Sequence, residues 1–217
     1  MSEHTPHAGN AEPLQRVSGA YADTPPWTPH ASAIWLGPRL WLLGVLAASI
    51  LLFSKLAEDV AGHEWIASLD RAVAASLHAQ TTALGAGVFT VVTYLGSALV
   101  LVPVTALAIL TLVRCARRAH AVFMGAALAG GEALNTTLKL AFGRPRPSFA
   151  DPLATAAGFS FPSGHAMVSI VAYGALAFVA SAAARSRWAK GLVVLSALVL
   201  ILAIGFSRIY LGVHYPS

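Results

Sequence analysis

Long apolar stretches separated by short polar connections dominate the sequence. They predict membrane-spanning helices over residues 40–57, 93–113, 121–140, 166–184 and 191–211, because a helix needs about 20 apolar residues to cross the hydrocarbon core. The uncharged stretch 83–113 would form about 46 Å of helix, longer than one crossing of about 30 Å, so its first part is expected at the interface. The pattern predicts an all-α, multi-pass transmembrane bundle with five spans.

The chain divides into three parts by this pattern. Residues 1–32 are polar and proline-rich without apolar periodicity, which predicts a disordered tail, and no cleavable signal peptide is recognisable. Residues 33–82 hold the first span and a segment in which Trp65, Leu69 and Val73 recur at helical spacing, as expected of an interfacial amphipathic helix. Residues 83–217 hold the other four spans.

Composition narrows the class of protein. Hydrophobic residues make up 57% of the chain and charged residues 11%, which excludes a disordered chain and an ordinary soluble globule. The net charge of +5 arises at the edges of apolar segments and in one loop, so no basic face for nucleic acid is expected. Cys115 is the single cysteine, which excludes an internal disulfide, and no His, Cys or carboxylate cluster has metal-ligand spacing. We expect no metal or other cofactor.

The distribution of Lys and Arg predicts the orientation of the bundle. The turns after the second and fourth spans are basic and should be cytoplasmic; their cations are Arg114, Arg117, Arg118, Arg185, Arg187 and Lys190. The loop at 141–164 and the end of the chain then lie at the outer, periplasmic face of the inner membrane. Four cations nevertheless occur on that side and need another explanation: Lys139, Arg144, Arg146 and Arg208.

Three short stretches are candidates for chemistry. They are Lys139 followed after six residues by Arg146-Pro147, the tetrapeptide Pro162-Ser163-Gly164-His165, and Ser207-Arg208 followed after five residues by His214. The first two share one loop, and two crossings separate the second from the third. All three therefore return to the same membrane face and can converge on one pocket.

The residue types in these stretches suit phosphoryl transfer. A lysine and two arginines offer point charge and forked donors for phosphate oxygens. Ser163 is a good helix N-cap, and the free N–H groups of Gly164 and His165 at the start of a helix favour an anion. The imidazoles of His165 and His214 supply a general acid and a nucleophile near neutral pH. Such a site needs no metal.

In this order and between spans, the three stretches closely resemble the signatures of the type 2 phosphatidic acid phosphatase superfamily, which includes the vanadium haloperoxidases. The resemblance covers residues from about 85 to 217. It implies that His214 attacks phosphorus to form a phosphohistidine and that His165 protonates the leaving group. It also implies that the phosphate is bound by five further residues, Lys139, Arg146, Arg208, Ser163 and Gly164. Membrane members of the family dephosphorylate phosphatidic acid, phosphatidylglycerol phosphate or polyprenyl diphosphate such as undecaprenyl diphosphate.

The third signature of that family continues to an Asp that orients the nucleophilic histidine. The sequence stops at Ser217, one position before it, and before an expected sixth span. Loss of the orienting acid in a Ser-His-Asp triad costs about 10⁴ in turnover. We therefore expect a truncated phosphatase core with low activity.

Three functions follow as alternatives. The favoured one is a phosphoric ester hydrolase acting on lipid phosphates among membrane lipids; the second is a non-catalytic protein that binds anionic lipid headgroups. A lipid transporter is disfavoured, because Glu132 and Asn135 are too few polar residues to form a path through the spans. Glu132 is interpreted as a buried contact of the bundle. Arg144 either touches the headgroup or faces water.

Overall fold

The computed structural model describes residues 30–62 and 64–217. Within them the chain forms seven helices and no strand: α1 (His30–Gly62), α2 (Glu64–Ala79), α3 (Ala83–Tyr94), α4 (Ala98–Arg114), α5 (Arg118–Phe142), α6 (Gly164–Ala183) and α7 (Arg187–Tyr210). The predicted N-terminal tail falls almost entirely outside the described residues. The chain divides into two compact units, Met1–Leu51 and Leu52–Ser217. The second unit contains every residue of the candidate site.

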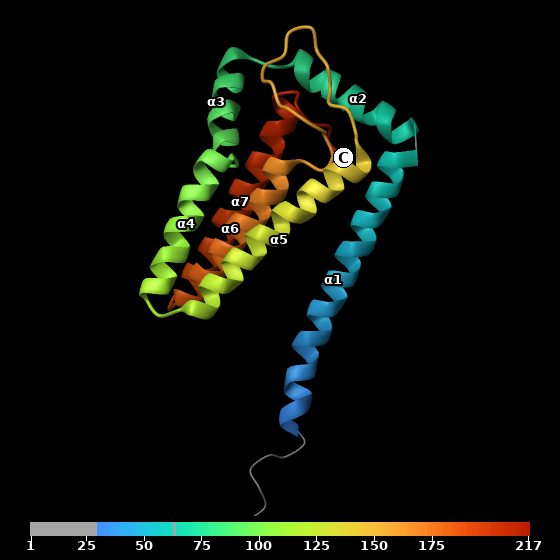
Figure 1. Ribbon diagram of the computed structural model, residues 1–217. Coiled ribbons are helices and arrows are strands. Elements are labelled where there is room, and N and C mark those ends of the chain that lie inside the picture. Colours follow the sequence, from blue (N-terminus) through green and yellow to red (C-terminus); the bar gives the residue numbers. More distant parts are fainter. Residues whose placement is uncertain (1–29, 63) are drawn as a thin grey trace, which may run out of the picture. The chain divides into compact units, whose positions relative to one another are not determined.

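In the second unit, helices α3 to α7 form a bundle (Figure 1). Helix α6 packs against α5 and α7, α5 also packs against α4, and α3 packs against α7. Figure 1 shows the α4–α5 and α6–α7 turns at one end of this bundle. Helix α2 and the loop between α5 and α6 lie at the other end. The basic turns and the loop that carries the candidate motifs are therefore at opposite ends.

The surface of the bundle is apolar and its interior is partly polar, the reverse of a soluble protein. Trp188 is 90% exposed and Leu99 77%, whereas Ser169 and Ser207 are fully buried. Small and polar residues between helices allow close packing where lipid, rather than water, surrounds the helices. Gly131 illustrates this, because a Cβ there would approach Val171 Cγ2 to 2.9 Å. The all-α membrane bundle predicted from the sequence is confirmed.

The predicted count of five spans is too high by one. Among the described residues, four stretches are long and apolar enough to cross a membrane: Leu40–Asp59, Ala83–Arg114, Gly164–Ala183 and Arg187–Tyr210. Helix α5 has 25 residues, but polar side chains at Glu132, Asn135 and Lys139 lower its hydropathy. The predicted second span also differs, because α3 and α4 are separate helices that together form one apolar stretch.

Local sequence signals set the helix ends near the site. Gly143 ends α5 in a left-handed conformation with φ of 57°, which suits a residue without a side chain. Ser163 precedes α6, and its hydroxyl accepts a hydrogen bond from the Ala166 N–H at 3.5 Å. Thr82 caps α3 in the same way. These caps fix where the loop of residues 143–163 leaves α5 and where it enters α6.

Candidate active site

One cavity of about 560 Å³ brings the three sequence motifs together at the loop end of the bundle. Its lining includes both imidazoles, the three predicted cations and the glycine at the start of α6, namely His165, His214, Lys139, Arg146, Arg208 and Gly164. The convergence predicted from topology is therefore seen in the fold. Ser163 does not line this cavity. It caps α6 and lies on a neighbouring cavity that His214 and Arg208 also reach.

The cavity has an excess of positive charge. No Asp or Glu is among the described residues that line it, whereas three of them are cations. Arg208 is only 6% exposed, and its guanidinium donates a hydrogen bond from Nη1 to the Thr93 hydroxyl at 2.8 Å. Its Nε is buried without a hydrogen-bond partner. A buried cation of this kind is stabilised by an anion, so the cavity is suited to bind one.

Arg146 shapes the loop around the cavity. Its guanidinium donates hydrogen bonds to the carbonyl groups of Ala157 and Gly158 at 2.9 Å and of Val213 at 2.7 Å. Lys139 similarly donates from Nζ to the Phe159 carbonyl at 2.9 Å. The two predicted phosphate ligands of the first motif therefore also hold the loop that forms one wall of the site.

His214 is oriented by two contacts. Its Nε2 lies 2.8 Å from Arg146 Nη1, and its Nδ1 lies 2.5 Å from the Ser160 carbonyl oxygen. Arginine can only donate and a carbonyl can only accept, so these partners require Nδ1–H and an unprotonated Nε2. The imidazole is thus held in the tautomer whose Nε2 lone pair faces the cation cluster. No pattern in the sequence indicated Ser160 as the orienting partner.

The electrostatic environment keeps this imidazole neutral. Burial is the main cause, and the charges of Arg146 and Arg208 add to it; together they lower the pKa of His214 from 6.5 to about 3. Burial also lowers the pKa of Arg146, although a guanidinium stays charged at any physiological pH. Near neutral pH the site therefore combines positive charge with an uncharged imidazole.

Two further residues of interest differ from the sequence interpretation. Glu132 is exposed rather than buried, and it lines a second cavity of about 560 Å³ that also reaches His165. Arg144 neither faces water nor lines the cation cavity, because it forms an ion pair with Asp70 of α2 at 2.6 Å. Thr93 and Ser160 were not singled out from the sequence, since a lone hydroxyl residue carries no spacing signal.

The fold and this site define a class of protein: a helical membrane protein with a cationic pocket that holds two imidazoles. Comparison with known proteins shows what this chain is similar to. Residues 120–217 match the model of the PAP2 superfamily. This match covers somewhat less than half of the chain.

Two known proteins are similar to this chain. Phosphatidylglycerophosphatase B of Bacillus subtilis is 38% identical over 86 residues, which are 39% of this chain and 41% of the relative. The alignment thus spans less than half of that relative's length. A crystal structure described as the first transmembrane PAP2 type phosphatidylglycerolphosphate phosphatase from Bacillus subtilis has a TM-score of 0.70 to this fold. It is 27% identical, and the match covers 77% of this chain and 84% of that one.

The low pKa of His214 predicts a pH dependence. An unfolded histidine titrates near pH 6.5, so between about pH 6.5 and 3 the unfolded chain binds a proton that folded His214 does not. The stability of the protein should therefore fall as the pH drops through this window, and less steeply in His214→Gln. NMR of histidine-labelled protein, with His214→Gln to assign the signal, should show a neutral His214 at pH 5. Titration of that signal near pH 6.5 would contradict the buried geometry.

Proposed function

We propose that the protein is a membrane lipid phosphate phosphatase that acts through a phosphohistidine intermediate. The observation that carries the proposal is the single cavity in which three cations, without a lining carboxylate, surround His165 and His214. Such a cavity favours a group with several anionic oxygens, and a phosphate monoester or diphosphate is that group. The family match and the name of the Bacillus subtilis relative agree with this chemistry.

The reaction follows from the tautomer of His214. Its Nε2 lone pair accepts a hydrogen bond from Arg146 and attacks phosphorus once the substrate phosphate takes over that donor. His165 takes up a proton when the anionic phosphate binds beside it, and it donates that proton to the leaving oxygen as the bond from phosphorus to that oxygen breaks. His165 then removes a proton from water, which attacks phosphorus; the phosphorus–nitrogen bond breaks and inorganic phosphate leaves.

The cations assist because they bind the oxygens on which negative charge accumulates during transfer. Lys139, Arg146 and Arg208 act as fixed positive charges that line the cavity. The N-terminus of α6 at Gly164 contributes its free N–H groups and the helix dipole. Ser163 acts indirectly in this scheme, as the cap that starts α6 at this point.

The second cavity provides a place for the lipid part of the substrate. It is lined by His165 and mostly apolar residues of α4, α5 and α6, with Glu132 and Asn135 among them, but not by His214. The leaving group departs from the face of phosphorus opposite the nucleophile, which is the side of the general acid. We therefore place the lipid alcohol in this groove, with its chains between the helices. Phosphatidic acid and phosphatidylglycerol phosphate are the substrate classes that we favour.

The orientation of the protein follows from the opposite ends of the bundle. Helix α5, although too polar to count as a span by composition, runs along the bundle, so the basic α4–α5 and α6–α7 turns lie away from the loop that forms the site (Figure 1). Because cytoplasmic connections are enriched in Lys and Arg, we place the site at the outer face of the inner membrane.

Substitution of His214 tests the proposed function directly. Purified protein in phospholipid nanodiscs should release inorganic phosphate from phosphatidic acid or phosphatidylglycerol phosphate, and His214→Ala should reduce release at least 10³-fold because the nucleophile is lost. Release should persist in EDTA, since the proposed chemistry uses only histidines and cations of the chain. Loss of release in EDTA with recovery in Mg²⁺ would contradict it. Binding of the lipid phosphate without release would support the headgroup-binding alternative.

The groove predicts a chain-length effect. Ala106 of α4 is exposed and lines the groove, so Ala106→Phe should narrow it. We expect the KM for dioleoyl phosphatidic acid to rise at least threefold, with a smaller rise for the dihexanoyl lipid. Leu107→Phe is the matched control, because Leu107 is 65% exposed and does not line the groove. An equal effect of the two variants on the long-chain lipid would contradict the placement.

A further inference from the structure

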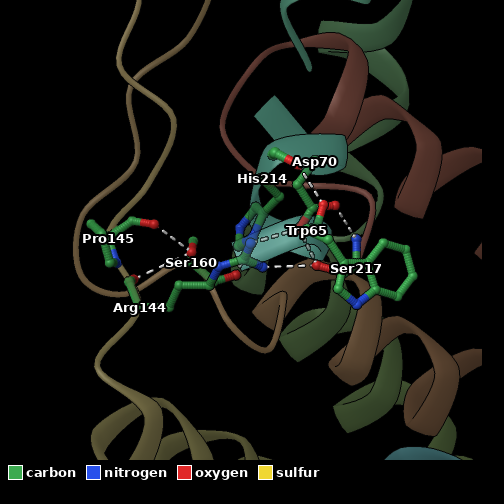
Figure 2. A network of polar contacts seen from close by, with 8 residues as sticks. Trp65, Asp70, Arg144, Pro145, Ser160, His214 and Ser217 are labelled. Carbon is green, nitrogen blue, oxygen red and sulfur yellow. Dashed lines mark hydrogen bonds and ion pairs between the residues drawn. The ribbon is translucent and has the colours of Figure 1, made fainter. Parts of the chain in front are cut away.

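A buried carboxylate on α2 holds the segment that carries His214. Asp70 is only 4% exposed, and its Oδ2 accepts a hydrogen bond from Arg144 Nη2 at 2.6 Å (Figure 2). Both side chains of this ion pair are nearly inaccessible, at 5% and 12% exposure. Neither residue lines the cation cavity. A buried ion pair outside the cavity contacts no substrate, so its effect on the reaction must pass through other residues.

One path runs from Asp70 to the chain that follows His214. The Ser217 N–H donates to Asp70 Oδ1 at 3.2 Å, and the Ser217 hydroxyl donates to Asp70 Oδ2. Arg144 Nη1 donates to the same hydroxyl at 2.8 Å, and the Arg144 guanidinium stacks on the Tyr215 ring at 4.4 Å from its centroid. The ion pair thus contacts two of the three residues that follow the nucleophile.

A second path runs through the backbone of the loop to the imidazole itself. The Arg144 carbonyl accepts a hydrogen bond from the Ser160 N–H at 2.8 Å, and the Ser160 hydroxyl donates to the Pro145 carbonyl at 2.7 Å. The Ser160 carbonyl in turn accepts from His214 Nδ1. Figure 2 shows these residues together, with dashed lines for the hydrogen bonds between them. Arg144 therefore supports one of the two groups that fix the tautomer of His214.

We propose that Asp70 is a positioning residue for His214, acting through Arg144 and Ser217. The proposal rests on the proposed phosphatase function. Asp70 fixes Arg144, and Arg144 fixes both the Ser160 carbonyl and the chain after His214. Small displacements of a nucleophile are costly, since a misplacement of about 1 Å can reduce the rate about 10²-fold. Helix α2, which carries Asp70, thereby becomes part of the catalytic apparatus.

The structure provides a matched control for this role. Asp151, in the same loop as Arg144, also pairs with α2, since its Oδ1 lies 2.9 Å from His78 Nε2. Its side chain is 86% exposed, and the structure gives it no contact with Ser160 or with residues 213–217. A substitution at Asp151 therefore weakens a contact between α2 and the loop without changing the residues that contact His214 or the chain after it.

Kinetics of four full-length variants in nanodiscs test the proposal. With phosphatidic acid as substrate, Asp70→Asn should lower kcat at least tenfold and leave KM within twofold, because binding cations are untouched. Arg144→Gln should match it, and the double variant should be no worse than either single one. Asp151→Asn should stay within twofold of the parent protein. Equal kcat values for Asp70→Asn and Asp151→Asn, or a change in KM alone, would overturn the proposal.

Arg144→Lys separates positioning from simple stabilisation. Lysine retains the charge opposite Asp70 but lacks the fork that reaches Asp70 and Ser217 together. We expect an unchanged melting temperature within a few degrees and a kcat reduced at least threefold. A kcat equal to that of the parent protein would mean that the ion pair only stabilises the fold. This variant also decides the matter if Asp70→Asn does not fold.

Amide hydrogen exchange gives a readout that does not need turnover. Arg144→Lys and Asp70→Asn should each accelerate exchange in residues 212–217, while exchange in α6 and α7 stays unchanged, and Asp151→Asn should accelerate none of these. If the parent protein releases no phosphate from any lipid, the proposed function fails. Hydrogen exchange then still tests whether Asp70 and Arg144 hold the segment that carries His214. Unchanged exchange in that segment would overturn the inference even if the parent protein is active.

Discussion

Positive charge held in a pocket without a neutralising carboxylate is the constraint on which the site end of this protein depends. Arg208 is buried at 6% exposure, and among the described residues the cavity wall offers it no acidic partner. Lys139 and Arg146 reach the same space from a different part of the chain. Loop carbonyl groups and the Thr93 hydroxyl offset part of the cost of desolvating these cations. In the proposed function, the remainder is offset when an anion with several oxygens, such as a phosphate, binds.

The same constraint accounts for the character of neighbouring elements. Helix α5 is less apolar than the other long helices because its face toward the site ends in Lys139 and includes buried Asn135. The loop of residues 143–163 needs no regular structure, since Arg146 and Lys139 bind its carbonyl groups directly. His214 stays uncharged because burial and the same cations disfavour its imidazolium form. In the proposed mechanism, one electrostatic arrangement therefore both attracts the substrate and keeps the nucleophile free of a proton.

Much of the fold and site could be predicted from the sequence. The length of an apolar stretch indicates a membrane span, and each motif is recognisable from the spacing of its residues along the chain. The convergence of the three motifs could be predicted by counting crossings, because two crossings return the chain to the same membrane face. The role of α2 could not be predicted, because its apolar stripe indicated only an interfacial helix with that stripe toward lipid. Trp65 and Leu69 are 60% and 54% exposed, whereas Asp70 is buried. A carboxylate beside Arg71 has the pattern of a solvated pair, and only the tertiary contact with Arg144 shows otherwise.

The central claim is that phosphate transfer passes through His214, and trapping the intermediate tests it most directly. Full-length protein mixed with ³²P-labelled lipid phosphate and quenched in base within milliseconds should retain label, because phosphohistidine survives base. Peptide mapping should place that label on the peptide that contains His214. Label on a different residue, or rapid phosphate release with no labelled protein at any time point, would contradict the account.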